Sequence, residues 1–100
     1  FAKILSMKSF TFFKQPNDVK LELADKIKVL RKKAGYTQQE LAKRTQVSYG
    51  SIKRFEQTGE ISLIHLLEIA RILDVLEDFD LLFNKKEEEI SDLVRKSFEE

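Results

Sequence analysis

The sequence has no cysteine, one histidine and no long apolar run. Without cysteine the chain forms no disulfide and no thiolate metal site, which fits a reducing cytoplasm. His65 has no second histidine or cysteine to complete a zinc site, so we interpret it as a partly exposed helical residue near Glu68. No segment approaches the roughly 18 apolar residues that span a bilayer, and residues 1–13 make a poor signal-peptide core. These absences predict a soluble, cytoplasmic protein without a metal or a membrane partner.

Signatures of catalysis are also missing from the sequence. There is no glycine-rich phosphate loop and no nucleophile motif. The carboxylates of Glu87, Glu88 and Glu89 follow one another on a charged stretch that reads as a solvated helix, not as a cleft. We therefore expect no enzymatic activity, no catalytic residues and no cofactor.

Length and charge favour one domain with two electrostatically different parts. The 100 residues, 42% of them hydrophobic, suit a single compact core. Net charge is only +1, but residues 20–60 hold ten basic and five acidic side chains, whereas residues 61–100 hold five basic and eleven acidic ones. An electrostatic partner responds to this local distribution. The basic part suits phosphate binding, and the acidic part suits a different partner.

Two short helices joined by a tight turn are predicted over residues 36–56. Thr37 with Glu40 three residues later is a capping box, in which each residue satisfies a free amide near the helix start. Ser48 is the expected cap of the second helix. Leu41 gives the first helix an apolar edge. The sequence therefore encodes two helix starts within 12 residues.

The second of these helices has two distinct faces. Ile52 and Phe55 share the inward face with Val47 from the turn, because residues three or four apart lie on one side of a helix. The outward positions are Tyr49, Gly50, Lys53, Arg54 and Gln57. They carry hydrogen-bond donors, positive charge and an aromatic ring but no acid. Such a face suits the major groove of DNA.

This stretch resembles the helix-turn-helix of the Xre/Cro/phage-repressor family. The residues that carry the family pattern are Thr37, Gln38, Glu40, Leu41, Ala42, Val47, Ser48, Ile52, Phe55 and Glu56. With its flanking helices the resemblance covers about residues 21–83. It implies an all-α, five-helix, lambda-repressor-like domain and a dimeric, sequence-specific repressor of double-stranded DNA, with helix 48–57 in the major groove. A helical hairpin without a nucleic-acid role is the alternative.

The resemblance places DNA contacts on the second helix, with Ser48 at its start. Tyr49 is expected to contact a thymine methyl group or donate through its hydroxyl, and Lys53 and Arg54 to donate to guanine O6 and N7. Gly50 has no side chain to reach with, so readout shifts to its neighbours. The alternative is that Lys53 and Arg54 only neutralise phosphates.

Three further assignments concern residues outside that helix. Gln38 matches a family position that binds the phosphate backbone and is expected to contribute affinity more than specificity. The amide of Gly59 can reach a phosphate because no side chain covers it. Arg31 matches a position that pairs with the glutamate ending the recognition helix, here Glu56. We interpret this pair as structural.

Two flanking helices are expected to complete the core. The first is predicted over residues 19–34, with Asn17 or Asp18 as its N-cap and Gly35 directly after its last residue. Its inner stripe consists of Leu23, Ile27 and Leu30. The second spans 62–73 with a stripe of Leu63, Leu66, Leu67 and Ala70. Ile64 and Ile72 lie off that stripe and are candidates for a contact with the fifth helix or with a second subunit.

The end of the predicted domain is less regular. Asp74 stands where the family usually has glycine, and Asp reaches left-handed conformations less easily than glycine does. A short helix over residues 76–83 is expected to follow, with Phe79, Leu82 and Phe83 closing the core.

Both termini lie outside this domain, which we place at residues 18–83. The arm of residues 1–17, with Met7 as a candidate natural start, is either loosely packed or forms a strand that pairs with its copy in a dimer. In the segment 84–100, Asn84 and Glu87 are a candidate capping box. One face of that segment carries Ile90, Leu93, Val94 and Phe98. Such a helix packs back, joins a second subunit or docks on a partner, and we favour self-association.

Two segments carry a narrower resemblance. FEQTGEISL at residues 55–63 and FDLLF at residues 79–83 are similar to Xre-type antitoxins and regulators of the HipB-like branch, which is associated with HipA-like toxins. This resemblance implies a second function, namely an interaction protein that binds and neutralises a toxin and uses DNA binding for autoregulation.

Overall fold

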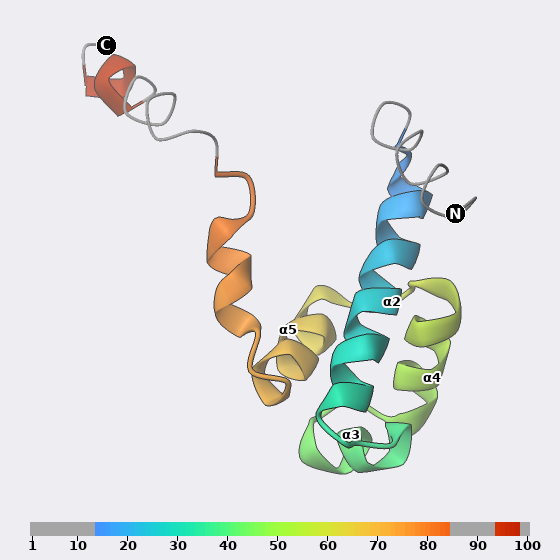
Figure 1. Ribbon diagram of the computed structural model, residues 1–100. Coiled ribbons are helices and arrows are strands. Elements are labelled where there is room, and N and C mark those ends of the chain that lie inside the picture. The colour runs from blue at the N-terminus through green and yellow to red at the C-terminus, as the bar shows by residue number, and fades with distance from the viewer. Residues whose placement is uncertain (1–13, 85–93, 99–100) are drawn as a thin grey trace.

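The computed structural model describes residues 14–84 and 94–98. Over the first range the chain forms α2 (Pro16–Lys33), α3 (Gln38–Arg44), α4 (Tyr49–Thr58), α5 (Leu63–Ile72) and the 3-10 helix η1 (Leu76–Leu81). Residues 94–98 are helical. No strand occurs in these two ranges, and the predicted all-α class is confirmed (Figure 1).

Helix α2 begins earlier than the predicted segment 19–34. Pro16 is its first residue, a position where proline's missing N–H is not needed and its fixed φ suits the helix. Gln15 is the N-cap, and its N–H donates to the Asp18 carboxylate at 3.0 Å. The prediction of Asn17 or Asp18 as the cap was therefore wrong. Pro16 starts the helix and does not end the arm.

The end of α2 follows the sequence prediction. Gly35 has a φ of +83°, a left-handed conformation that glycine adopts without steric cost. The N–H of Tyr36 donates to the carbonyl oxygen of Arg31 at 3.1 Å, which closes the last turn of the helix. The chain thereby reverses from α2 into α3 within four residues.

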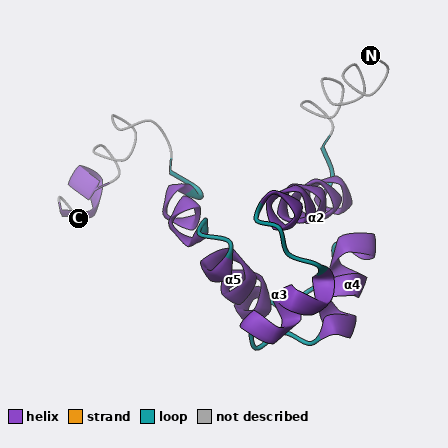
Figure 2. Ribbon diagram, turned by 60° about the horizontal axis from the view of Figure 1, so that its bottom comes forward, coloured by secondary structure: helices purple, strands orange, loops and turns teal. Residues whose placement is uncertain are grey.

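One apolar core lies among the four α-helices. Its buried side chains are Ala24 and Ile27 of α2, Leu41 of α3, Val47 of the turn, Ile52 and Phe55 of α4, and Leu66, Ile69, Ala70 and Leu73 at α5. Helix α2 packs along α4, and α3 contacts both α4 and α5. Figure 2 shows α3 and α4 together on one side of α2. Leu23 and Leu30, predicted to form the inner stripe of α2 with Ile27, are only partly buried and pack at the edge of the core.

The apolar face of α5 differs from the predicted stripe. Leu63 is 68% exposed, whereas Ile69, which the stripe omitted, is fully buried. The buried face consists of Leu66, Ile69, Ala70 and Leu73. This spacing is that of a single helical face. Leu63 begins the helix, and its exposure shows that the other described elements do not cover this side chain.

Asp74 ends α5 in a left-handed conformation, with a φ of +63°. The N–H of Val75 donates to the carbonyl oxygen of Ala70 at 2.9 Å, as in a helix closed by glycine. Aspartate is one of the few residues with a side chain that reaches this region. It therefore ends the helix where the family usually has glycine.

The element after α5 is the 3-10 helix η1, not a helix over residues 76–83. Phe79 packs against the core as predicted. Leu82 is half-exposed and Phe83 is 97% exposed, so their prediction as core residues was wrong. The helix ends at Leu81, and Phe83 has a φ of +62°, which turns the chain away from the core.

Several predictions fall on residues 1–13 and 85–93, outside the part of the chain that the structure describes. These are the N-terminal strand and the contributions of Glu87, Ile90 and Leu93 to the last helix. The side-chain amide of Asn84 donates to the carbonyl oxygen of Asp80 at 3.0 Å. Val94 and Phe98 are exposed. None of the helices in the described ranges combines the length and apolar character needed to cross a bilayer.

Candidate nucleic-acid interface

Two predicted caps fix where α3 and α4 begin. The Thr37 hydroxyl accepts the Glu40 N–H at 3.0 Å, and the Glu40 carboxylate accepts the Thr37 N–H at 3.2 Å. Hydrogen bonds to the Glu40 carboxylate, first from the Thr37 backbone N–H and then from the Thr37 side chain, hold the pKa of Glu40 below its ordinary value. At α4 the Ser48 Oγ accepts the Ser51 N–H at 3.1 Å. Both caps are confirmed, so Ser48 has a structural role whether or not it contacts DNA.

The turn between α3 and α4 is held by a side chain that the sequence analysis did not identify. The Thr45 hydroxyl donates to the carbonyl oxygen of Leu41 at 3.0 Å and accepts the N–H of Val47 at 3.1 Å. Val47 is buried directly after this turn. The turn is thus held by one hydroxyl group and one apolar anchor, and it contains no left-handed residue.

Arg31 and Glu56 form the predicted ion pair, which joins the end of α2 to α4. Arg31 Nε donates to Glu56 Oε2 at 2.7 Å, and Arg31 Nη2 donates to Oε1 at 2.9 Å. The two side chains are 8% and 3% exposed, respectively. The remaining Nη1 donates to the carbonyl oxygen of Tyr36 at 2.8 Å. The pair is bidentate and confirmed, and one guanidinium also fixes the loop before α3.

Gln38 belongs to the same hydrogen-bond network. Its Nε2 donates to Glu56 Oε1 at 2.9 Å, and its side chain is only partly exposed. The family resemblance predicted a phosphate contact for Gln38, and no pattern in the sequence indicated its hydrogen bond to Glu56. The first residue of α3 is therefore tied to the last turns of α4. The second N–H of the Gln38 amide is the donor that remains for a phosphate.

The charge of Glu56 is stabilised by its hydrogen bonds. Burial alone would raise the pKa of this carboxyl, but hydrogen bonds from Arg31 and Gln38, together with nearby positive charge, lower it below 4.5. Glu56 is the only acidic residue of α4. Because its carboxylate is buried and neutralised, α4 presents no exposed negative charge to a polyanion.

The outward side of α4 is the surface predicted to read DNA. Tyr49, Gly50, Lys53, Arg54 and Gln57 are all exposed. No acidic residue lies in the first turn of this helix. The opposite side buries Ile52 and Phe55 in the core. The structure thus brings together the aromatic ring and the two cations that the spacing predicted.

Arg44 adds a positive charge at the end of α3 that the sequence analysis overlooked. Its guanidinium carbon lies 4.8 Å from the centroid of the Tyr36 ring, within the range of a cation–π contact. Arg44 itself is exposed. The signal available in the sequence was only that Lys43 and Arg44 end a helix, which the helix dipole alone explains.

Gly59 has a structural role different from the predicted one. Its N–H donates to the carbonyl oxygen of Phe55 at 2.7 Å, so this amide is already used at the end of α4. Gly59 has a φ of +78°, and an added Cβ would lie 2.9 Å from the Lys20 backbone. Beside it, Lys20 pairs with Glu60 and lowers the pKa of that carboxyl through a hydrogen bond and its charge. We therefore leave Gly59 out of the interface.

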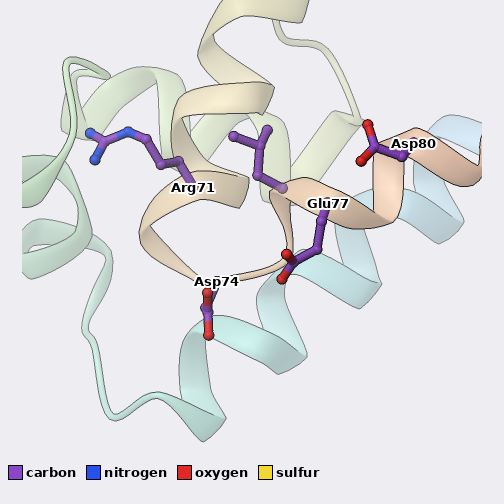
Figure 3. Close-up of a pocket in the computed structure, with 5 residues that line it drawn as sticks. Arg71, Asp74, Glu77 and Asp80 are labelled. Atoms are coloured by element: carbon purple, nitrogen blue, oxygen red, sulfur yellow. The ribbon is translucent and has the colours of Figure 1, made fainter.

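Two surface cavities are alternative candidate sites. One, of about 250 Å³, is lined by Arg54, Glu60 and His65 together with Ser51, Ile61 and Ser62. The other, of about 420 Å³, lies between the end of α5 and η1, lined by Arg71, Asp74, Leu76, Glu77 and Asp80 (Figure 3). In Figure 3 the labelled side chains extend in different directions and do not converge on one point. The described residues contain no group of three or more ligands suited to a metal ion.

A comparison with protein-family models matches residues 27–79 to a family described as helix-turn-helix. The matched segment extends from the middle of α2 to η1 and includes α3, α4 and α5 completely. It contains both partners of the ion pair and the whole outward side of α4. Searches of curated proteins and of solved structures gave no significant match.

Proposed function

Because this chain belongs to the helix-turn-helix family of the Xre/Cro/phage-repressor type, a family of DNA-binding transcriptional regulators, we propose that it is a dimeric, sequence-specific repressor. In this proposal α4 lies in the major groove of double-stranded DNA. The observation that carries it is the outward side of α4, which combines Tyr49, Lys53 and Arg54 without an exposed acid.

The side chains on this face match the groups that base edges present. Lys53 and Arg54 donate to guanine O6 and N7, a contact worth about 1–3 kcal/mol of discrimination against the wrong base. The Tyr49 ring contacts a thymine methyl group, or its hydroxyl forms a hydrogen bond. Because Gly50 and Arg54 are four residues apart, they lie on the same side of the helix. Base readout is thus concentrated in the first six residues of α4.

Phosphate contacts hold α4 at a fixed depth and register. Gln38 donates the second N–H of its amide to a phosphate while its first remains on Glu56. Arg44, held against Tyr36, supplies a charge at the other end of α3. Because the Gln38 side chain is hydrogen-bonded to Glu56 of α4, a phosphate bound by Gln38 positions α4 as well.

The test begins with selection of bound duplexes from a random pool, followed by titrations on single-base variants of the selected operator. Tyr49→Ala, Lys53→Ala and Arg54→Ala should each weaken binding most for the cognate base and relax the preference at one position. Lys26→Ala, an exposed cation of α2, is the matched control. If all three variants lose affinity equally on every duplex, these residues only neutralise phosphates, and the proposed readout is wrong.

For the dimer, the proposed association element is the segment 84–100. Repressor dimers read two half-sites about 34–36 Å apart, so loss of the dimer weakens operator binding without unfolding the domain. Deleting residues 84–100 should give a folded monomer in sedimentation. A truncated protein that stays dimeric would move the interface to the arm or to the exposed Leu63 and Ile64.

An antitoxin role is the second candidate function. It is favoured by the excess of acidic residues over residues 61–100 and by the exposed apolar side chains at the end of η1, namely Leu81, Leu82 and Phe83. In this case the acidic part binds a toxin and DNA binding serves autoregulation. A kinase-like toxin encoded in the neighbouring reading frame, whose product forms a stable complex with this chain, would support it. If the two proteins form no complex, the antitoxin role is refuted and the repressor role remains.

A further inference from the structure

Gly50 is the one glycine among the three in this sequence whose presence the described protein does not explain. Gly35 and Gly59 have positive φ angles, and Gly59 also lies against the Lys20 backbone. Gly50 is the second residue of α4, has no positive φ, and is exposed. An added Cβ at this position would meet no neighbouring heavy atom within 4 Å. Within the described structure, alanine would fit equally well.

A glycine in a helix lowers stability relative to alanine, because glycine loses more conformational freedom on folding. At Gly35 and Gly59 this loss is offset by the backbone conformation that glycine permits. At Gly50 nothing within the described residues offsets it. The space left by the missing side chain therefore becomes useful only when something outside the chain occupies it.

We propose that Gly50 determines specificity by admitting the C5-methyl group of a thymine directly against its Cα. The inference rests on the proposed function, since it requires α4 in the major groove. The first residues of a recognition helix lie nearest the base edges. Gly50 is one of these, between Tyr49 at the helix start and Lys53 and Arg54 one turn later.

The chemistry of the position selects thymine among the four bases. The Cα of glycine presents only C–H groups, so it favours an apolar contact. In the major groove the apolar group on a base edge is the thymine methyl, whereas the other base edges offer hydrogen-bond donors and acceptors. The donors of Lys53 and Arg54 serve those polar edges. A Cβ at position 50 would occupy the space of the methyl group and hold α4 away from the base.

The experiment compares one methyl group on the protein with one on the base. Each thymine of the selected operator is replaced in turn by deoxyuridine, which lacks only the methyl group. For one thymine, the wild-type protein should lose about fourfold in affinity, the equivalent of about 0.8 kcal/mol for one buried methyl group. Gly50→Ala should bind the thymine operator about tenfold more weakly. It should regain affinity on the deoxyuridine duplex, because the new methyl group fills the vacated space.

Two measurements separate this result from general damage. The Tm of Gly50→Ala should be equal to or above that of the wild type, since alanine favours the helix. Lys26→Ala, an exposed change on α2, should keep the dependence on that thymine. If Gly50→Ala binds every duplex as the wild type does, or loses the same factor on all of them, the thymine contact is refuted. A selection that yields no preferred duplex would instead overturn the proposed function itself.

Discussion

Replacing Arg31 with methionine would leave the carboxylate of Glu56 buried without its cation. The Glu56 side chain is 3% exposed, and Arg31 supplies two of the three side-chain hydrogen bonds that its oxygens accept. Removing one partner of a buried ion pair costs about 3–5 kcal/mol. The Tyr36 carbonyl also loses its donor. We therefore expect the free energy of unfolding of Arg31→Met to fall by about 3–5 kcal/mol.

The pH dependence of this loss follows from the lowered pKa of Glu56. A carboxyl whose pKa is lower in the folded state than in the unfolded state stabilises the fold above its unfolded pKa, here ordinarily 4.5. That contribution disappears as the pH falls through the folded pKa. The difference in stability between wild type and Arg31→Met should therefore be largest near neutral pH. It should narrow in acid, as the pH falls through the pKa of Glu56 in the variant and then through its lower pKa in the wild type.

Urea denaturation followed by circular dichroism measures both effects. The series comprises Arg31→Met, Glu56→Leu and the double variant, with Lys32→Met as a control at an exposed neighbouring position. The control should lie within about 0.5 kcal/mol of the wild type. The double variant should lose much less than the sum of the single ones, because neither charge is left unpaired. Single variants as stable as the control, or strictly additive losses, would refute the reasoning.

Three smaller predictions test other parts of the fold by thermal or urea unfolding. Thr45→Val removes the hydroxyl that holds the turn and should cost about 1 kcal/mol, whereas Thr45→Ser should retain most of the stability. Gly59→Ala should lower the Tm clearly, because the new Cβ meets the Lys20 backbone at a positive φ. Phe79→Ala should cost roughly 2 kcal/mol, less than a fully buried phenylalanine, and Phe83→Ala should stay within about 0.5 kcal/mol.

The features that were predictable from sequence are those encoded within a few residues. The capping box of Thr37 and Glu40, the Ser48 cap and the left-handed Gly35 each depend on neighbours no more than four positions away. The two faces of α4 also follow from helical spacing alone. The ion pair of Arg31 and Glu56 is a different case, since it spans 25 residues and came only from the family resemblance.

The features that were missed depend on what lies opposite a residue in space. Helical spacing predicts on which side of α5 the Leu63 side chain lies, but it does not predict whether another helix packs against that side. Gln38 contacts Glu56 across 18 residues, and no local pattern encodes such a distance. Gln15 was overlooked because glutamine is an uncommon cap, and Pro16 was placed within the predicted arm of residues 1–17 and not at the start of a helix.

On α4 the residues that fold the protein and those proposed to read DNA are separate. Glu56, Ile52 and Phe55 hold the helix in place, and the side chains of Tyr49, Lys53 and Arg54 form no hydrogen bond or ion pair within the described residues. Exposed substitutions of this kind change stability by only about 0.5 kcal/mol. The outward residues can therefore be exchanged for others while the scaffold stays intact. Descendants of one ancestral chain could acquire new operators by such exchanges without passing through an unstable intermediate.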